Sequence, residues 1–193
     1  MTRKGILFVI SGPSGVGKGT IKDAVLERIK DIRLSISVTT RAPRQGEING
    51  REYFFIDHKE FQDLIDKDQL LEWANVYSNR YGTPRSFVME NLEKGQDVLL
   101  EIDIQGALQV KRSMPEGVFI FIAPPSIEEL QARLYGRNKD SKESILERLA
   151  AYQQEMEHMK YYDYVVVNDV VATAADQVEA IIIAERCKFK NMR

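Results

Sequence analysis

The feature that most constrains this chain is a glycine-rich loop, Gly12-Pro13-Ser14-Gly15-Val16-Gly17-Lys18-Gly19-Thr20, which joins an apolar run at 6–10 to a helical pattern. Glycine adopts positive φ at little cost, so such a loop can turn successive backbone N–H groups toward one anion. The following helix adds the positive end of its dipole, and Lys18 adds a full charge. The order of strand, loop and helix therefore predicts a cradle for the phosphates of a nucleotide.

Apolar runs recur at 6–10, 98–102, 118–123 and 164–167, and each is bounded by turn residues or charges. Runs of this length are typical of strands buried on both faces of a parallel sheet. Helical patterns cover about 18–30, the segment after Asp103, the segment after Ser126, a stripe over 145–159, and about 172–190. Alternation of strands and helices predicts an α/β fold, a parallel sheet with right-handed crossovers.

The segment 38–90 has a different character, because glycines, aromatic residues and charges are mixed in it. It carries only a short predicted helix after Asp57, with Phe61, Leu64 and Ile65 as its buried side. We interpret this segment as an inserted lobe, partly of antiparallel strands. The carboxyl ends of parallel strands are where ligands collect, so the lobe and the glycine loop are expected to project on the same side.

The rest of the chain divides around this lobe as one domain. The expected core covers about 1–37, 96–125 and 160–193. Arg133 and Arg137 lie one helical turn apart before a polar segment, and Arg148 follows on the next helix. This pattern indicates a lid over about 126–159.

The composition argues against several kinds of partner and site. With 193 residues, 44% hydrophobic residues and a formal net charge of -2, the chain is expected to be globular, and its mildly acidic total argues against a nucleic-acid partner. One cysteine and two histidines leave no material for an internal disulfide or a structural zinc site, which suits a cytoplasmic protein. The longest later apolar stretch, 118–123, is too short for a membrane span, and the first run ends in a loop, unlike a signal peptide.

A longer series of motifs follows the loop in order. It consists of Ser35 to Glu47, Asn49 to Tyr53, Glu72-Trp73-Ala74, Tyr81-Gly82-Thr83, Glu101 to Gly106, Phe121 to Ser126, Arg133 to Arg137, Arg148-Leu149 and Val167-Asn168-Asp169. With it, nearly the whole chain resembles the guanylate kinase family of P-loop nucleoside monophosphate kinases. The resemblance implies a P-loop sheet with a GMP-binding lobe and a helical lid, and transfer of a phosphoryl group from ATP to GMP in purine metabolism and GMP recycling. It implies ATP and GMP as ligands, with Mg²⁺ accompanying ATP, in a monomer or a homodimer.

The resemblance also assigns the GMP site. It places Arg41, Arg44, Tyr53 and Tyr81 on the GMP phosphate, and Glu72 with the hydroxyls of Ser37 and Thr83 on the guanine, next to Gly82. Arginine forks and phenol hydroxyls suit a phosphate monoester. A carboxylate can accept from the N1–H and amine of guanine while hydroxyls face O6. The plainer alternatives are solvated arginines, tyrosines in a core, and a solvated charge at residue 72.

For the ATP side, the resemblance assigns residues 12–20 to the phosphates, Asn168 to adenine, and Lys18, Arg137 and Arg148 to the transferring group. Asp103 is expected to end a strand, hold magnesium or its waters, and lie beside the guanine. Its alternative role is the N-cap of a helix over 104–113. Asn168 is otherwise a turn residue, and Arg133 is expected to make ordinary helix-surface pairs.

The loop departs from the strict pattern at residue 19, where Gly19 replaces the Ser or Thr that ordinarily binds magnesium. Thr20 lies about 100° further around the helix, so its hydroxyl cannot occupy the same place. We expect Thr20 to help hold the α-phosphate. Magnesium is then expected to be bound by ATP oxygens and waters, one of them anchored by Asp103.

Three other functions compete with this interpretation. A guanylate-kinase-like interaction module would keep the GMP surface to bind phosphorylated peptides, but such modules typically lose the glycine loop and the lid. A kinase for another nucleoside monophosphate is disfavoured by Glu72 with its two hydroxyls. A nucleic-acid-binding role has only the basic cluster at 41–51 in its favour.

Overall fold

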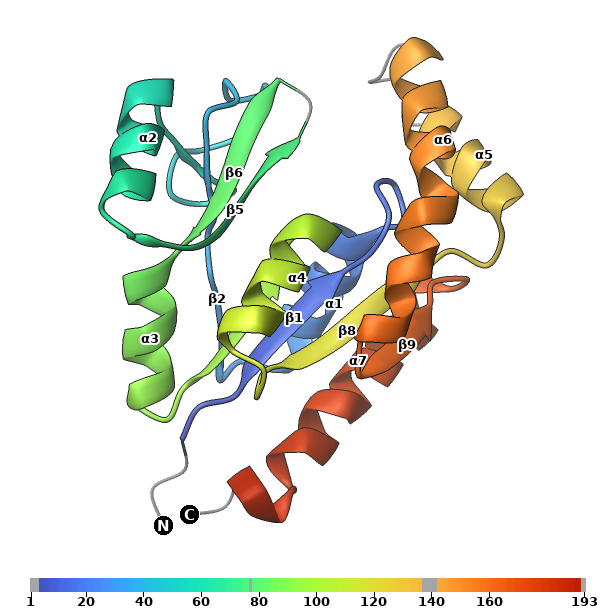
Figure 1. Cartoon of the computed structure of the whole chain (residues 1–193). Helices are drawn as coiled ribbons and strands as arrows, with labels where there is room; N and C mark the ends of the chain where they lie inside the picture. The colour runs from blue at the N-terminus through green and yellow to red at the C-terminus, as the bar shows by residue number, and fades with distance from the viewer. Residues whose placement is uncertain (1–3, 77, 137–141, 192–193) are drawn as a thin grey trace.

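A computed structural model describes residues 4–76, 78–136 and 142–191. Its central sheet has five parallel strands in the order β2-β7-β1-β8-β9 (Figure 1). They are β1 (Leu7–Ser11), β2 (Ile32–Leu34), β7 (Asp97–Glu101), β8 (Val118–Ala123) and β9 (Tyr164–Val167). The parallel sheet predicted from the four apolar runs is thus confirmed, because the inner strands β1, β7 and β8 are buried along nearly their whole length.

Two strands differ from the prediction. The edge strand β2 was not predicted, because its three residues include the exposed Arg33 and carry no apolar run. The opposite edge strand, β9, was expected to be buried on both faces, and this was wrong. Val165 and Val167 are about half exposed, because β9 is the edge strand and pairs with β8 on one side only in the described part of the chain.

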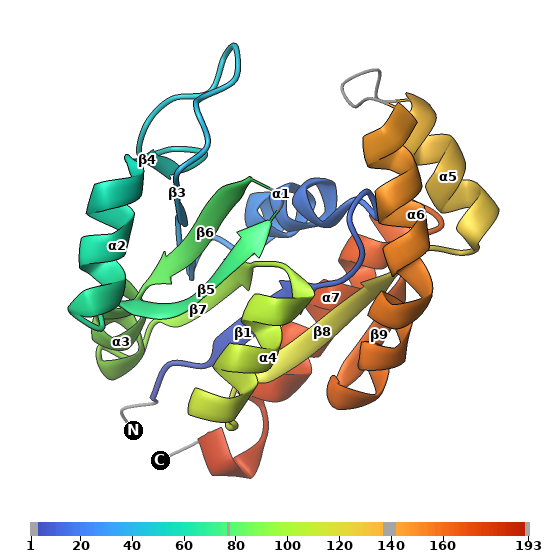
Figure 2. The same ribbon diagram turned by 45° about the horizontal axis from the view of Figure 1, so that its top comes forward.

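Helices cover both faces of the central sheet (Figure 2). On one face, α1 (Lys18–Arg28) and α7 (Val171–Arg186) bury Val25 and Val178 in one cluster with Phe8 of β1. On the other face lie α3 (Arg85–Glu93) and α4 (Ile104–Ser113), whose apolar residues cluster with those of β1 and β7. The glycine loop leaves β1 between these layers.

The inserted lobe is a four-stranded sheet in the order β4-β3-β6-β5, with one helix, α2 (His58–Asp66). Its strands are β3 (Val38–Thr39), β4 (Phe54–Phe55), β5 (Leu70–Val76) and β6 (Asn79–Pro84), and the β3–β6 and β5–β6 pairs are antiparallel. Helix α2 begins at a capping box of Asp57 and Glu60, and Phe61 is fully buried against Val38 and Leu70. The predicted short helix and the antiparallel strands are confirmed.

Residues 85–93 form a second helix that was not expected within 38–90. The apolar residues Val88 and Leu92 of α3 pack with Val98 and Leu100 of β7, so this helix belongs to the core of the central sheet. Its hydrophobic periodicity is short, because it spans only nine residues and is divided by charged positions.

Two helices, α5 (Ile127–Gly136) and α6 (Lys142–Glu157), stand above the sheet on the side opposite the four-stranded lobe (Figure 1). The N–H of Glu129 donates to Oγ of Ser126, which caps α5, and the carboxylate of Glu129 accepts from Arg133. Ile145, Leu149 and Tyr152 pack against α5, and a short 3₁₀ helix, His158–Tyr161, leads from α6 to β9. A second 3₁₀ turn, Phe189–Asn191, follows α7.

None of the helices in the described ranges combines the length and the apolar character that crossing a membrane requires.

Candidate active site

The glycine loop has the backbone that its sequence predicts. Gly12, Gly15 and Gly17 have φ values of 146°, 91° and 94°, and a Cβ at Gly12 would lie only 2.2 Å from the carbonyl oxygen of Ile122. The Nζ of Lys18 donates to the carbonyls of Gly12 at 2.7 Å and Pro13 at 3.0 Å. The ammonium group therefore lies inside the loop that the sequence assigns to phosphate.

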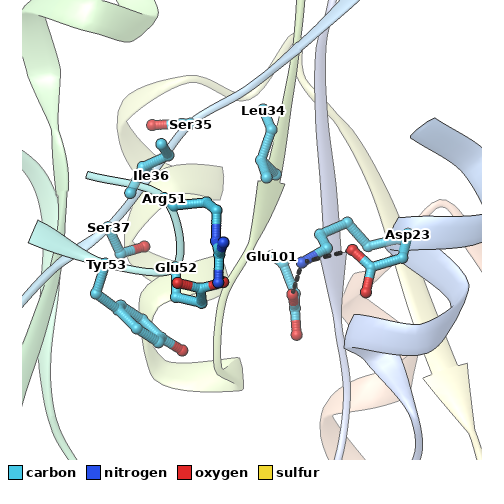
Figure 3. Close-up of a pocket in the computed structure, with 10 residues that line it drawn as sticks. Asp23, Leu34, Ser35, Ile36, Ser37, Arg51, Glu52, Tyr53 and Glu101 are labelled. Atoms are coloured by element: carbon cyan, nitrogen blue, oxygen red, sulfur yellow. Dashed lines mark hydrogen bonds and ion pairs between the residues drawn. The ribbon is translucent and has the colours of Figure 1, made fainter. Parts of the chain in front are cut away.

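Glu101 is a site residue that the sequence analysis did not single out. It is the last residue of β7, and its carboxylate forms an ion pair of 3.4 Å with Lys22 of α1 (Figure 3). A Cβ on Gly19 would lie 3.5 Å from its Oε1, so Glu101 faces the position where a P-loop ordinarily carries Ser or Thr. It is the one charged residue in the apolar run at 98–102, and this was the signal that could have identified it.

Asp103 lies two residues beyond the strand, so the expectation that it ends the strand was wrong. Its Oδ1 accepts from the N–H of Gly106 at 3.1 Å and caps α4, which confirms the alternative role considered for it. Thr20, on the first turn of α1, is exposed.

Asn168 follows β9 and is almost completely buried. Its Nδ2 donates to the carbonyl of Val16 at 2.7 Å, so it ties the end of β9 to the glycine loop. Its Oδ1 has no hydrogen-bond partner within the described ranges. Arg133, besides pairing with Glu129, donates to the carbonyl of Asn168 at 2.8 Å and so links α5 to the same place.

Helix α6 brings two charged residues to the site. Arg148 is half-buried, and Glu155 follows it two helical turns later on the same side of the helix. Burial raises the pKa of Glu155, whereas the nearby charge of Lys18 lowers it, Asp103 raises it and Arg148 lowers it. Glu155 was missed by the sequence analysis, although its spacing from Arg148 was a usable signal. Arg137 lies outside the described residues.

The residues assigned to the GMP phosphate form an aromatic and cationic group on the lobe. The rings of Tyr53 and Tyr81 are 5.7 Å apart, and the guanidinium of Arg41 lies 5.5 Å from the ring centroid of Tyr53. Burial raises the pKa of Tyr53 to about 12, so its hydroxyl remains a donor at neutral pH.

Glu47 binds the side chain of Arg41 and the backbone of Arg44. Nη2 of Arg41 bonds both of its carboxylate oxygens, at 2.9 and 3.0 Å, and the backbone N–H of Arg44 donates to Oε2 at 2.7 Å. These hydrogen bonds lower the pKa of Glu47, and the bonds from Arg41 have the largest effect. Partial burial of the carboxylate opposes the shift. A carboxylate of the chain thus meets Arg41, as an anionic ligand would, while Arg44 as a whole is exposed.

The residues assigned to guanine meet across the β5–β6 ladder, where Glu72 is paired with Thr83. The Thr83 hydroxyl donates to Oε1 of Glu72 at 2.6 Å, and Glu72 is only 4% exposed. Burial raises the pKa of Glu72 to about 8; the Thr83 hydrogen bond opposes this shift, and the charge of Asp103 adds to it. Gly82 lies between Tyr81 and Thr83, where a Cβ would meet the side chain of Leu70 at 2.9 Å.

A cavity of about 350 Å³ lies between the lobe and the central sheet (Figure 3). Ser37 and Tyr53 line it from the lobe side, and Glu101 and Lys22 line it from the central sheet and α1. Of the residues assigned to GMP, Ser37 and Tyr53 therefore share this cavity, while the Glu72–Thr83 pair lies outside its lining.

Asp103 connects the parts of the site electrostatically. Its charge acts on Glu72 in the lobe and on Glu155 of α6, which also feels Lys18 of the loop. The glycine loop, strand β5 of the lobe and helix α6 lie around the carboxyl end of the central sheet (Figure 2). Such a region can hold two anionic ligands, one at the loop and one at the lobe.

Comparison with known proteins gives one consistent result. The family model described as guanylate kinase matches residues 4–185. A guanylate kinase of Syntrophomonas wolfei is 62% identical over 192 residues, covering 100% of this chain and 98% of the relative, and one of Caldanaerobacter subterraneus is 55% identical over 186 residues, covering 96% and 90%. The crystal structure of guanylate kinase from Anaplasma phagocytophilum is 38% identical, with a TM-score of 0.83 over 98% of this chain and 90% of that one. With a family match over nearly its entire length and relatives of this identity, the chain belongs to the guanylate kinase family.

Proposed function

We propose that the protein transfers the γ-phosphoryl group of ATP to GMP, giving ADP and GDP. The observation that carries the proposal is the buried Glu72–Thr83 pair in the lobe, together with a glycine loop that keeps its lysine. A buried carboxylate in the lobe selects a base with adjacent N–H donors, and the loop binds a polyphosphate. The two substrates are thereby bound by different elements of the fold.

On the ATP side, residues Gly12 to Thr20 hold the phosphates through backbone N–H groups and the start of α1. Asn168 keeps the loop in place through Val16, and its Oδ1, which has no hydrogen-bond partner among the described residues, is a candidate acceptor for the adenine amine. Lys18 leaves the loop carbonyls to neutralise the outer phosphates. Thr20 is assigned to the α-phosphate.

On the GMP side, Arg41, Arg44, Tyr53 and Tyr81 bind the phosphate. We infer that the GMP phosphate displaces the carboxylate of Glu47 from Arg41, because both are anions that suit the same bidentate donor. Glu72 accepts from the guanine N1–H and amine. Ser37 and Thr83 are assigned to O6, and for Thr83 this role requires its hydroxyl to turn from Oε1 of Glu72 to the base.

The transfer step requires positioning and neutralisation of charge rather than a general base, because the acceptor is already a phosphate oxygen. Lys18, Arg148 and Arg137 are assigned to the oxygens of the transferring group, where charge develops in the transition state. For these residues to meet the lobe, three parts of the chain close on one another and exclude water. They are the core of about 1–37, 96–125 and 160–193, the lobe of about 38–90 and the lid of about 126–159.

The donor set suits Mg²⁺ that enters with ATP. Within the described residues, no group of three or more His, Cys, Asp or Glu side chains could hold a metal ion without other ligands. Mg²⁺ ordinarily keeps several waters and binds one or two carboxylates with substrate phosphates. Asp103 is assigned to one such water. When bound, the ion neutralises charge on the phosphates.

A coupled assay of ADP release with GMP, dGMP, AMP, CMP and UMP as acceptors tests the proposal, with Lys18→Ala as the negative control. GMP is expected to be the preferred ribonucleotide acceptor, and chromatography is expected to detect GDP. Equal rates with AMP and GMP, or ADP release without formation of GDP, would contradict the proposed function.

A further inference from the structure

The backbone of the strand that carries Glu72 is hydrogen-bonded to α4 through the side chain of Gln109. Nε2 of Gln109 donates to the carbonyl of Trp73 at 2.7 Å, and the N–H of Trp73 donates to Oε1 of Gln109 at 3.3 Å. Strand β5 lies at the edge of the four-stranded sheet, so these backbone groups have no neighbouring strand on that side. The carboxamide of Gln109 takes the place of that strand.

An irregularity in the β5–β6 ladder aims two consecutive side chains at α4. The register shifts between Leu70 and Glu72. Leu71 joins the apolar cluster that contains Ala107 and Val110 of α4, and the next residue, Glu72, reaches the same helix. Bulges often redirect a side chain in this way beside functional sites.

Gly106 makes room for that carboxylate. A Cβ on Gly106 would lie 2.3 Å from Oε2 of Glu72 and 2.9 Å from its Cδ, which is closer than such atoms can approach. Gly106 and Gln109 are three residues apart on α4 and therefore share one side of the helix. One residue admits the carboxylate, and the other fixes the backbone next to it.

We propose that Gln109 is a positioning residue for nucleobase selection, because its two hydrogen bonds to Trp73 hold the carboxylate of Glu72 against Gly106. The inference rests on the proposed function, in which Glu72 recognises guanine. Gln109 itself touches no reacting atom. It fixes the position of the Glu72 carboxylate, which belongs to the inserted lobe, relative to α4 of the central core.

The test replaces Gln109 with methionine, which is similar in length but offers neither hydrogen bond. In Gln109→Met, KM for GMP is expected to rise about tenfold, and the preference for GMP over AMP in kcat/KM is expected to fall by a similar factor. KM for ATP should stay within about twofold, because both hydrogen bonds that the substitution removes go to Trp73 of the lobe and not to the glycine loop. Gln177→Met on the exposed side of α7 is the matched control.

Gly106→Ala provides a second test that leaves Gln109 intact. The added methyl must displace the carboxylate of Glu72, so the same selective loss for GMP is expected. If Gln109→Met does not fold, this variant still tests whether the contact between Gly106 and the Glu72 carboxylate positions that carboxylate. Wild-type KM values for GMP in both variants would overturn the inference, and so would equal losses for GMP and ATP.

Binding can be measured without turnover, because Trp73 is the only tryptophan of the chain. A titration of its fluorescence with GMP is expected to show weaker binding in Gln109→Met than in the wild type and in Gln177→Met. If the wild-type protein binds GMP but forms no GDP, the proposed function fails while the weaker binding still supports Gln109. If the wild type forms GDP and Gln109→Met binds GMP equally well, only the role of Gln109 fails.

Discussion

The hydroxyl of Thr83 donates a 2.6 Å hydrogen bond to Oε1 of Glu72, and these two side chains, on neighbouring strands, are almost completely buried. The carboxyl group is thus oriented before any ligand arrives. Buried polar groups that are held in this way reject a ligand that leaves them unpaired. The discrimination between bases is expected to depend on this pair.

Replacing Glu72 with glutamine should weaken that discrimination. The amide can turn its donor toward the guanine donors, so the preference for GMP over AMP in kcat/KM is expected to fall by about 1–3 kcal/mol. Glu90→Gln, on the exposed side of α3, is the control. An unchanged preference in Glu72→Gln would place base recognition elsewhere in the molecule.

The raised pKa of Glu72, about 8, predicts that GMP binding releases a proton. At pH 7 the free protein holds this group mostly neutral, while guanine requires it as a carboxylate. Observed GMP affinity should therefore fall as the pH drops below 8. Calorimetry at pH 7 in two buffers of different ionisation enthalpy should detect close to one proton released.

The GMP phosphate also titrates, near pH 6, so Glu72→Gln is needed as a reference. Equal proton release by this variant and the wild type would show that Glu72 does not change its protonation. The same shift affects stability without ligand. Because the folded pKa lies above the ordinary value of 4.5, the free energy of unfolding should decrease as the pH rises from about 4.5 toward 8, and less so in Glu72→Gln.

Lys18→Ala should reduce kcat by about a hundredfold or more, because a charge directed at the transferring group acts chiefly in the transition state. Lys94→Ala, an exposed lysine after α3, serves as the control in a steady-state assay. Wild-type turnover in Lys18→Ala would refute its role.

The arginines of the lobe and the lid should separate kinetically. Arg44→Ala is expected to raise KM for GMP by about tenfold or more, because its phosphate contact exists before and during transfer, whereas Arg148→Ala is expected to lower kcat. Arg33→Ala, on the edge strand β2, is the control. If calorimetry found unchanged GMP binding in Arg44→Ala, the assignment of this arginine to the phosphate would be wrong.

The metal requirement should depend on Asp103 more than on Thr20. Asp103→Asn is expected to raise the Mg²⁺ concentration needed for half-maximal activity, with little effect of Thr20→Ala on that concentration. Gly19→Ser should be tolerated, because a Cβ at this position lies at an ordinary 3.5 Å from Glu101. A complex with a Thr20 oxygen about 2.1 Å from the ion would overturn the assignment.

Much of the fold and the phosphate loop followed from short-range patterns. The positive φ values of the loop glycines, the cap at Ser126 and the capping box at Asp57 are each encoded within a few consecutive residues. The inner strands were evident because a segment buried on both faces must be apolar throughout. The resemblance of ordered motifs to guanylate kinases added the candidate residues of the site.

The remaining features depend on segments distant in the sequence. Gln109 and Trp73 are separated by 36 residues, and the local sequence around neither residue predicts their hydrogen bonds. Folding also brings Glu155 and Glu101, which are distant from the glycine loop in the sequence, beside that loop. The short strand β2 and the helix α3 likewise form because they complete a core built by other strands. Local propensity sets which elements form, whereas register, a bulge and packing between layers determine which side chains meet.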